Sequence, residues 1–539
     1  MTYFTTGKIF LIPSFDLEVK ELEKIDRFMI FLENSNVGEV ISRYVKNNSQ
    51  KGGRPNCNYY RLFATILFGF AFDKYTLREI ESACKFDLRY ITIMEQTHVN
   101  FSTICKFINK VIVPNEKEIF ALICTQIKKE LRLEFEDAFI DGTKFEANAN
   151  KYKFVWIPLT FHERLSIKAY EIIFKYNLLA SHKMEKYIRS SIIAKALSNL
   201  ESQKDSLNLK EYRMVFKTLS TMLEKVLEYE VKEEICGDKR NSYYKTDHDA
   251  TAMCLKSDYY SGLGTNMHAA YNVQSLVIRG FIFSYYVSQS RNDSNDFIPV
   301  LDAFFSNYGC YPTRVCADSG YGNLINYDYL KRNHIENYVK YISWEGNITG
   351  RNPDYYYLNE DNTIICLNQQ IGYEVTILNR HPKKAKAVFF RVKGCNNCGF
   401  SLFCKKYMKK TDEDFKVFEV IKELQLHKQE ATRNLLSVKG IEIRVNRSIQ
   451  VEGIFAIIKQ DYGRTRFKRR GIEKVSTETM LYFLGLNIAK LFRYYETNQL
   501  NKYWVAPESL MPQEFKKPSA KKLTKRGKRT NERLYGKKE

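Results

Sequence analysis

A single carboxylate in a short apolar strand is the feature that most constrains how this chain folds. The run FIDGTKFEANANKYKF, residues 139–154, begins with apolar residues at strand spacing and has Asp141 as its third residue. Side chains alternate between the two faces of a strand, so Phe139, Asp141 and Thr143 are predicted to share one face. An isolated strand aspartate is more often a turn or capping residue than a catalytic one. Its role therefore depends on which other segments reach the same place.

Two later segments carry carboxylates in settings that suit a site. In RVCADSGYGN, residues 314–323, a short apolar strand runs into Asp318, and open α/β sheets place their sites at the carboxyl ends of strands. In residues 447–471, apolar positions at helical spacing surround Glu452 and Lys459. Seven residues of a continuous α-helix turn through about 700°, which predicts these two side chains nearly in line, about two turns apart. The pattern predicts an acid and a base on one helix face.

The charge balance points to a class of partner. The chain has 539 residues and a formal net charge of +22, from 84 Lys and Arg against 62 Asp and Glu. Such an excess favours a polyanion, above all nucleic acid, and the alternative is a basic soluble protein without such a partner. A hydrophobic content of 44%, with 14% aromatic residues, excludes wholesale disorder. The length predicts roughly two to four domains, each able to bury a core.

Membrane and export features are weak. The longest strongly apolar run, LFATILFGFAF in residues 62–72, is far shorter than the roughly 20 residues that cross a bilayer. The initial run MTYFTTGKIFLIPSF has no apolar core of useful length before the first acidic residues. We therefore expect a cytoplasmic protein with no membrane partner. In that reducing compartment, the 12 cysteines are not expected to form a disulfide framework.

Residues 1–130 are predicted to be helical. Thr76 and Glu79 have the spacing of a capping box, Leu62, Ile66 and Phe70 form an apolar stripe, and Asn115 is positioned to cap a further helix. Further along, residues 158–234 are rich in Lys, Glu, Leu and Ile and almost free of Gly and Pro, which predicts two or three long helices in a hairpin arm. The amino-terminal helices fit either a helix-turn-helix-like DNA reader or a plain packing domain.

The middle of the chain alternates strand-like and helical segments. Two strand-like runs, MHAAYNVQSL and GFIFSYYVSQS, are followed by a helix candidate in residues 297–305 and then by the Asp318 strand. This order predicts a mixed sheet with helices packed on it. Residues 337–418 favour strands and turns, as in NYVKYISW and AKAVFFRV.

Four cysteines fall inside that strand-rich stretch. Cys395 and Cys398 have the spacing of a zinc knuckle, and Cys366 and Cys404 are the further thiols nearby. Tetrahedral thiolate sites draw pairs of ligands from separate hairpins, so a structural zinc site is one reading. Unligated thiols are the alternative.

Basic residues concentrate after the predicted acid-and-base helix. This run contains Arg464, Arg466, Lys468, Arg469 and Arg470, and an apolar helix, ETMLYFLGLNIAKLFRYYE, follows it. Residues 501–539 are predicted to be a disordered cationic tail, which either contacts phosphates or is simply solvated.

Taken together, five motifs resemble the bacterial insertion-sequence transposases of the DDE class, most closely the insertion-sequence group numbered eleven eighty-two. They are FIDGTKFEANANKY, TDHDA, YNVQ, ADSGYGN and RSIQVEGIFAIIK followed by RRG, in the family's order. The similarity extends to YRLFATILFG, LREIE and FSTICKF, and so covers most of residues 55–495.

The resemblance implies an α/β fold: a ribonuclease H-like mixed sheet with helices, interrupted by a helical and a strand-rich insert and preceded by an all-helical domain. The implied divisions are 1–130 for DNA-end binding, 131–335 with 440–500 for the catalytic core, 158–240 and 336–439 for the two inserts, and 501–539 for the tail. The implied catalytic acids and ligands of Mg²⁺, or Mn²⁺, are Asp141, Asp318 and Glu452.

The family's Glu-x6-Lys element maps onto Glu452 and Lys459, and its upstream Arg most nearly onto Arg447. Related transposases often carry a Tyr shortly before that Arg, where this chain reads Arg444, Val445 and Asn446, so an aromatic role there is in doubt. Lys459 is expected near a phosphate, and Arg447 is expected to grip one bidentately, although both also suit an ordinary charged surface. Trp344 is expected in the core, with stacking on a displaced base as the alternative.

The implied activity is a DNA transposase that binds terminal inverted repeats, frees a 3′-OH and joins it to target DNA, since two Mg²⁺ ions can serve the attacking and leaving oxygens of a phosphodiester. The implied partners are double-stranded DNA, as ends and as target, and a second copy of the chain in a homodimer. Three alternatives remain: a nuclease without strand transfer, a catalytically inactive DNA-binding protein of the same fold, and a zinc-centred regulator built around the cysteines.

Overall fold

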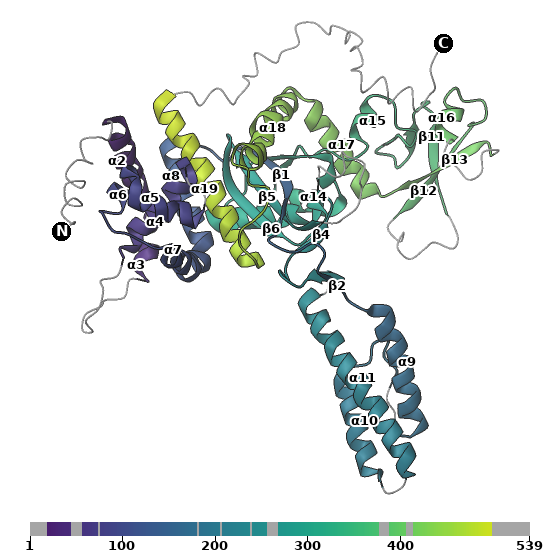
Figure 1. The fold of residues 1–539 in the computed structure, drawn as a ribbon. Helices are drawn as coiled ribbons and strands as arrows, with labels where there is room; N and C mark the ends of the chain where they lie inside the picture. Colours follow the sequence, from purple (N-terminus) through teal and green to yellow (C-terminus); the bar gives the residue numbers. More distant parts are fainter. Residues whose placement is uncertain are drawn as a thin grey trace, which may run out of the picture.

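The structure is a computed structural model of the chain (Figure 1). It describes residues 19–44, 57–73, 76–179, 183–204, 207–237, 240–255, 268–376, 387–405 and 413–497. The side chains of Val19, Lys20 and Glu452 lie outside this description, although their backbone is included. The predicted tail, residues 501–539, and residues 1–18 also lie outside the described residues.

The amino-terminal part is helical, as predicted. Thr76 caps its helix with Glu79 in a full capping box, and Leu62, Ile66 and Phe70 are buried. Asn115 takes the predicted cap position, but its side chain donates to the Val111 carbonyl instead of accepting from the helix. The elements of this region are α2 (Val19–Asn34), α3 (Val37–Ser42), α4 (Tyr59–Phe68), η1 (Gly69–Asp73), α5 (Leu77–Phe86), α6 (Leu88–Ile93), α7 (Phe101–Phe107), η2 (Ile108–Ile112), η3 (Val113–Asn115) and α8 (Glu116–Leu131).

A six-stranded mixed sheet forms the centre of the molecule. β1 lies between an antiparallel partner, β5, and a parallel partner, β7, and the order across the sheet is β4-β5-β1-β7-β8, with β6 also paired to β5. This arrangement confirms the predicted α/β class with a ribonuclease H-like mixed sheet. The strands are β1 (Asp137–Glu146), β4 (Thr251–Met253), β5 (His268–Ile278), β6 (Phe281–Ser288), β7 (Arg314–Ala317) and β8 (Glu336–Asn337).

Helices pack on this sheet and complete its core. α18 lies against β1 and β7, while α13 and α19 lie against β6. The helical elements are η5 (Asp293–Asp296), α13 (Phe297–Tyr308), η6 (Ser319–Tyr321), α14 (Leu324–Arg332), α18 (Val438–Ala456), the π-helix η8 (Ile457–Asp461) and α19 (Ile472–Thr497). Among the residues described, no helix has both the length and the apolar character needed to cross a membrane.

The amino-terminal helices and the sheet share one hydrophobic core. Buried residues from Ile25 through Phe492 form a single cluster, and α19 joins the two parts. The ring of Phe492 packs against Phe28 and Phe72, with centroids 6.2 and 5.4 Å apart. Gly485 lies so close to η1 that an added Cβ would meet the Phe70 carbonyl oxygen at 2.6 Å. The division of the chain into domains stays a prediction, and a common core links residues 19–131 to the central sheet.

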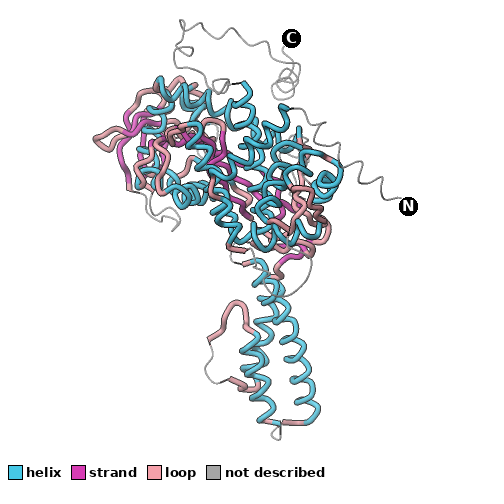
Figure 2. Tube along the Cα trace, turned by 90° about the vertical axis from the view of Figure 1, so that its left-hand side faces the viewer, coloured by secondary structure: helices cyan, strands magenta, loops and turns pink. Residues whose placement is uncertain are grey.

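The segment after β1 projects from the body as an arm (Figures 1 and 2). A two-stranded sheet of β2 (Phe154–Trp156) and β3 (Ser242–Tyr244) forms its base. Of the two or three long helices predicted, the structure has three: α9 (Leu159–Lys175), α10 (Ser190–Ser202) and α11 (Leu209–Cys236). They bury a hydrophobic cluster of their own, separate from that of the body.

The strand-rich stretch forms a five-stranded antiparallel sheet in the order β13-β12-β11-β10-β9. The expectation that NYVKYISW is a strand is wrong, because only Asn337 belongs to β8 and Trp344 begins a helix whose start packs into the core. The elements are α15 (Trp344–Ile348), β9 (Tyr356–Leu358), β10 (Ile364–Cys366), β11 (Ile371–Val375), β12 (Val388–Lys393), α16 (Ser401–Lys405), β13 (Phe415–Val420) and α17 (Lys422–Leu436). α17 leads the chain back to the central sheet.

Candidate active site

Two of the predicted acids lie side by side at the sheet. β1 and β7 run parallel with Ile140 opposite Ala317, so Asp141 and Asp318 are the next residues of neighbouring chain segments. Parallel neighbours at matching register point their side chains to the same side of the sheet. Asp318 also caps η6, where its carboxylate accepts a hydrogen bond from the Ser319 amide at 2.8 Å. The parallel register of β1 and β7 thus brings two carboxylates that are far apart in sequence to one face.

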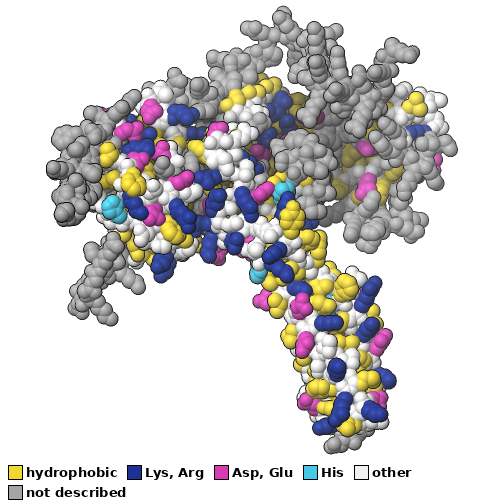
Figure 3. Space-filling model, viewed as in Figure 1, with side chains coloured by type: hydrophobic (Ala, Val, Ile, Leu, Met, Phe, Trp, Pro, Cys, Tyr) yellow, Lys and Arg dark blue, Asp and Glu magenta, His cyan; other side chains and the backbone are white. Residues whose placement is uncertain are grey.

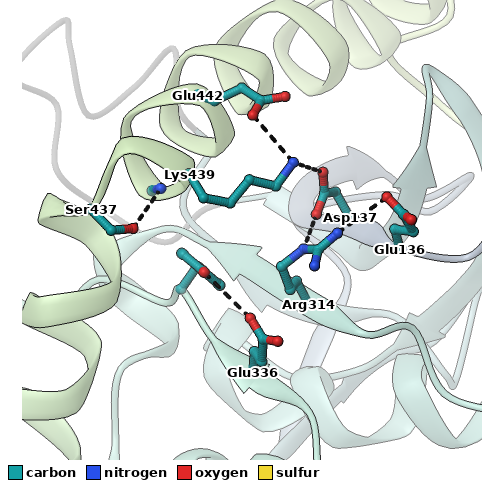
Figure 4. Close-up of polar contacts among 9 residues, drawn as sticks. Glu136, Asp137, Arg314, Glu336, Ser437, Lys439 and Glu442 are labelled. Atoms are coloured by element: carbon teal, nitrogen blue, oxygen red, sulfur yellow. Dashed lines mark hydrogen bonds and ion pairs between the residues drawn. The ribbon is translucent and has the colours of Figure 1, made fainter. Parts of the chain in front are cut away.

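The helix α18 runs along this face and is tied to β1 near its start. Lys439 Nζ lies 2.9 Å from Asp137 Oδ2 and 3.2 Å from Glu442 Oε2, and the guanidinium of Arg314 holds the same aspartate (Figure 4). Further along, Arg447 Nη2 lies 3.7 Å from Asp141 Oδ1.

The distance between these two contacts is nearly the same along α18 as along β1. From Lys439 to Arg447 the helix rises about 12 Å, and from Asp137 to Asp141 the strand advances about 13 Å. α18 therefore follows the strand direction, with its Arg447 end at the predicted acid.

A third contact with β1 lies beyond Glu452 in the chain, at Lys459. Lys459 Nζ donates to Thr143 Oγ1 at 2.6 Å and to the Lys144 carbonyl at 2.7 Å. Glu452 lies in α18 between Arg447 and Lys459, both of which contact the Asp141 face of β1. The Glu452 side chain lies outside the described residues. The backbone of α18, to which Glu452 belongs, runs along the sheet face that carries Asp141 and Asp318.

The expected alignment of Glu452 with Lys459 assumed one continuous α-helix, and the structure has a π-helix in part of this segment. α18 ends at Ala456 and continues as the π-helix η8, in which Lys459 lies. The wider turn of a π-helix rotates later side chains back relative to a continuous α-helix. The lysine accordingly lies against the strand, with its ammonium also 4.6 Å from the centre of the Phe145 ring.

Arg447 is mostly enclosed and incompletely satisfied. Its side chain is 16% exposed, and its Nε is buried with no hydrogen-bond partner among the described groups. A buried N–H that lacks an acceptor is costly, and guanidinium groups suit paired anionic oxygens. The Arg447 guanidinium thus lies beside Asp141 with one buried N–H that has no acceptor among the described groups.

The opposite face of β1 supports the site through buried polar contacts that the sequence did not mark. The Tyr321 hydroxyl donates to Gln274 Oε1 at 2.5 Å, and Asn272 Nδ2 donates to Asp293 Oδ1 at 2.7 Å. Burial raises the pKa of Tyr321 well above its ordinary value, and the charges of Asp293 and Asp141 raise it further. The available signal was the polar Asn272 and Gln274 within a strand that is otherwise apolar.

The TDHDA motif has a structural role at the start of α19. Asp247 Oδ1 accepts from the Gly471 amide at 3.2 Å and from the Tyr271 hydroxyl at 2.8 Å, and Asp249 Oδ2 accepts from the Ile472 amide at 2.8 Å. Carboxylates at a helix N-terminus satisfy its unpaired N–H groups. These acids therefore hold α19 and the preceding basic run against the sheet.

The basic run lies along the far end of β1. Arg466 donates to the carbonyls of Ala147 and Ala149, and Arg470 to that of Asn148. Arg469 differs, because its guanidinium donates to Asn109 Oδ1 at 3.0 Å and burial lowers its pKa.

A cavity of about 510 Å³ opens here, bordered by Tyr152, His268, Arg466 and Arg470 among others. Glu146, which also borders it, is five residues beyond Asp141, roughly 16 Å along the strand. The cavity and the acids thus lie along one strand.

The remaining sequence predictions fall in two places. Trp344 is buried, with Lys340 and Arg444 over its ring at 5.0 and 5.3 Å, which confirms the core reading. The four predicted cysteines border one small cavity. In the part of the chain that the structure describes, no group of three or more Cys, His, Asp or Glu side chains is arranged so that it could hold a metal ion.

Comparison with known families finds two matches. A model described as Transposase DDE domain matches residues 365–492, and one described as Transposase domain (DUF772) matches residues 15–110. Both are transposase families. The first match contains Glu452 and α18 but neither Asp141 nor Asp318, and together the matches support an insertion-sequence transposase of the DDE type. No curated protein and no solved structure matches the chain.

Proposed function

We propose that this chain is a DNA transposase that binds the terminal inverted repeats of an insertion sequence, cleaves a strand and joins the freed 3′-OH to target DNA. The observation that carries the proposal is the register of β1 and β7, which sets Asp141 beside Asp318 while α18, with Glu452, crosses the same face. The transposase family matches agree with it. The proposed group remains the one numbered eleven eighty-two.

Asp141, Asp318 and Glu452 are the proposed holders of divalent metal. Carboxylate oxygens are the ligands that Mg²⁺ prefers, and the register of β1 and β7 sets Asp141 beside Asp318, with Asp141 26% exposed, so the residues present fit such an ion. Bound Mg²⁺, or Mn²⁺, would supply charge stabilisation to the attacking and leaving oxygens of a phosphodiester.

The chain's own residues orient the acids and the DNA strand. Arg447 holds the Asp141 carboxylate by charge, and its remaining N–H groups offer donors to a phosphate oxygen. Lys459 fixes η8 to β1 through Thr143 and so sets the position of α18. Its positive charge stays at the edge of the site, where a phosphate is expected.

DNA contacts are proposed along the basic run and beyond it. Arg466, Lys468 and Arg470 are exposed, Arg464 is half-buried, and they lie with Arg469 between β1 and α19. Lys and Arg side chains are also spread over the visible body and arm (Figure 3), as expected for a chain with net charge +22. The amino-terminal helices are the proposed reader of the DNA ends, a homodimer is the proposed form on DNA, and the proposed location is the cytoplasm, on DNA.

The test is cleavage and joining of DNA that carries the flanks of the coding region. Purified full-length chain with Mg²⁺ should cut at the ends and yield joined products. Asp141→Asn and Glu452→Gln should each lower the cleavage rate at least about a hundredfold, roughly 2.7 kcal/mol of transition-state stabilisation, and leave DNA affinity nearly unchanged. Glu360→Gln, an exposed acid between β9 and β10, is the matched control and should cleave as the native chain does.

Each other outcome has a definite meaning. Normal cleavage by Asp141→Asn would refute the assignment of the acids. Cleavage without joined products would replace the transposase with a nuclease. DNA binding without any metal-dependent chemistry in the native chain would leave a DNA-binding protein of this fold.

A further inference from the structure

The five-stranded sheet β13-β12-β11-β10-β9 has only a small hydrophobic core to stabilise it. The buried hydrophobic residues of its cluster are Leu358, Ile364, Phe390, Val392, Phe418 and Val420. A core this small rarely stabilises a sheet alone, and small units of this kind are commonly held by disulfides or by a metal. No disulfide joins the cysteines of the described residues.

Four cysteines from three places converge beside this core. Cys366 ends β10, Cys395 and Cys398 follow β12, and Cys404 lies in α16. All four border one cavity of about 30 Å³, close to the space that one water-sized particle needs. Three of these cysteines lie within ten residues of the chain, two of them with knuckle spacing, and Cys366 joins them from β10.

The local hydrogen bonding suits a thiolate ligand. The Phe400 amide donates to Cys398 Sγ at 3.4 Å, two residues after the cysteine. An N–H directed at sulfur stabilises negative charge there, and groups that hydrogen-bond to ligand atoms orient them for a metal. The turn after Cys395 is fixed as well, since the Asn396 amide donates to Asp414 Oδ1 at 2.8 Å.

Two buried lysines supply the charge that such a site requires. Lys405 and Lys416 border the same cavity, and each is 6% exposed. Lys416 Nζ donates to the Cys404 carbonyl at 3.1 Å and to Asp354 Oδ1 at 2.8 Å, and Lys405 Nζ donates to the Glu413 carbonyl at 2.7 Å. Four thiolates around a divalent ion carry a net charge of about −2, and ammonium groups next to the cavity lower the cost of burying that charge.

We propose that Cys366, Cys395, Cys398 and Cys404 bind one structural Zn²⁺ that holds β10, β12 and α16 together. The four sulfurs border the cavity without meeting in a closed set, so binding draws these side chains inward. Zinc with four thiolates is tetrahedral and closed, so this site has no open position and no part in DNA chemistry. The proposal does not rest on the transposase function.

Metal analysis of the purified full-length chain is the direct test. About one zinc per chain is expected in the native protein and in Cys310→Ser, whose cysteine is exposed and outside the cavity. The double variant Cys395→Ser, Cys398→Ser should retain less than about a tenth of that amount. Its amino-terminal helices and central sheet should stay folded, as measured by circular dichroism and a cooperative thermal transition.

A second measurement on the native chain covers the case in which the variant fails to fold. A mercurial thiol reagent should release the zinc as four thiols react, and Co²⁺ added to the metal-free protein should give a thiolate-to-cobalt charge-transfer band. Folded native protein that holds neither zinc nor cobalt would overturn the proposal. Iron bound in place of zinc, with its visible thiolate absorption, would overturn the choice of metal.

Discussion

At the scale of single residues, neighbouring positions of β1 face different partners on the two sides of the sheet. Asp141 faces α18, while the next residue, Gly142, faces the side chain of Gln274 from β5. A Cβ on Gly142 would lie 2.0 Å from Gln274 Nε2. That amide is fully buried and accepts from the Tyr321 hydroxyl, so it has little freedom to move. The glycine is therefore needed for close approach and not for an unusual backbone conformation.

Gly142→Ala is expected to lower the free energy of unfolding by about 1–3 kcal/mol, because overpacking a full core displaces neighbours. Chemical denaturation of the native chain and the variant measures the difference. Gly320→Ala is the control, since nothing lies within 4 Å of a Cβ added there.

A double-mutant cycle with Gln274→Ala separates the clash from other causes. Gly142→Ala should cost much less in the Gln274→Ala background than in the native chain. An equal cost in both backgrounds would show that the amide is not the obstacle.

At the scale of elements, α19 is held at its start and in its second half by contacts from the segments that connect strands. Asp247 and Asp249 accept from the amides at its start, and Lys490 Nζ donates to the Gly280 carbonyl at 2.5 Å between β5 and β6. Burial of that lysine lowers its pKa to about 8, with the nearby Arg493 charge acting in the same direction. The helix thus carries a cation that is disfavoured in the folded chain.

The sign of the resulting pH dependence is fixed by that shift. An unfolded lysine has a pKa of about 10.4, so below pH 8 the folded chain bears the full cost of the charge. Between about pH 8 and pH 10.4 the folded chain releases this proton first, and the cost fades as pH rises.

Lys490→Met should therefore raise the free energy of unfolding at pH 7 by on the order of 1 kcal/mol, after allowing for the lost hydrogen bond. The gap between variant and native chain should narrow by pH 10. Urea denaturation at both pH values measures it, with the exposed Lys474→Met as a control that shows no narrowing. A gap that widens with pH would contradict the assignment.

At the scale of the whole molecule, the arm is separable from the body. Its helices bury their own cluster, and the chain enters and leaves through the pair Trp156 and Ser242 of β2 and β3. The Ile157 amide also donates to the Asn241 carbonyl at 2.9 Å, so the two ends of the arm lie next to each other. The body's core contains no residue of the arm helices.

Removing residues 158–240 and joining Ile157 to Asn241 through an Asn-Gly turn should leave a folded body. Such a turn suits two antiparallel strands. The thermal midpoint of the body is expected to change by no more than roughly 4 °C, and the helical circular dichroism signal should fall by the share of the three helices. Aggregation, or loss of the cooperative transition, would show that the arm is needed for folding.

Local patterns predicted much of this architecture, and long-range pairing accounts for what they missed. The Thr76 capping box and the shared face of Asp141 and Thr143 depend on residues a few positions apart, and both are present. The π-helix that contains Lys459 was not predicted, because such a turn leaves no clear mark in a single sequence. The roles of Asp247 and Gln274 depend on partners far along the chain, which spacing alone does not reveal.

The packing of Phe492 against Phe28 also sets an order of events during synthesis. The amino-terminal helices are made first, yet α19, the helix that completes their core, is synthesised more than 300 residues later. A nascent or prematurely terminated polypeptide accordingly lacks the partner on which those early segments close. Under the proposed function, only a chain synthesised through α19 would be competent to bind a transposon end.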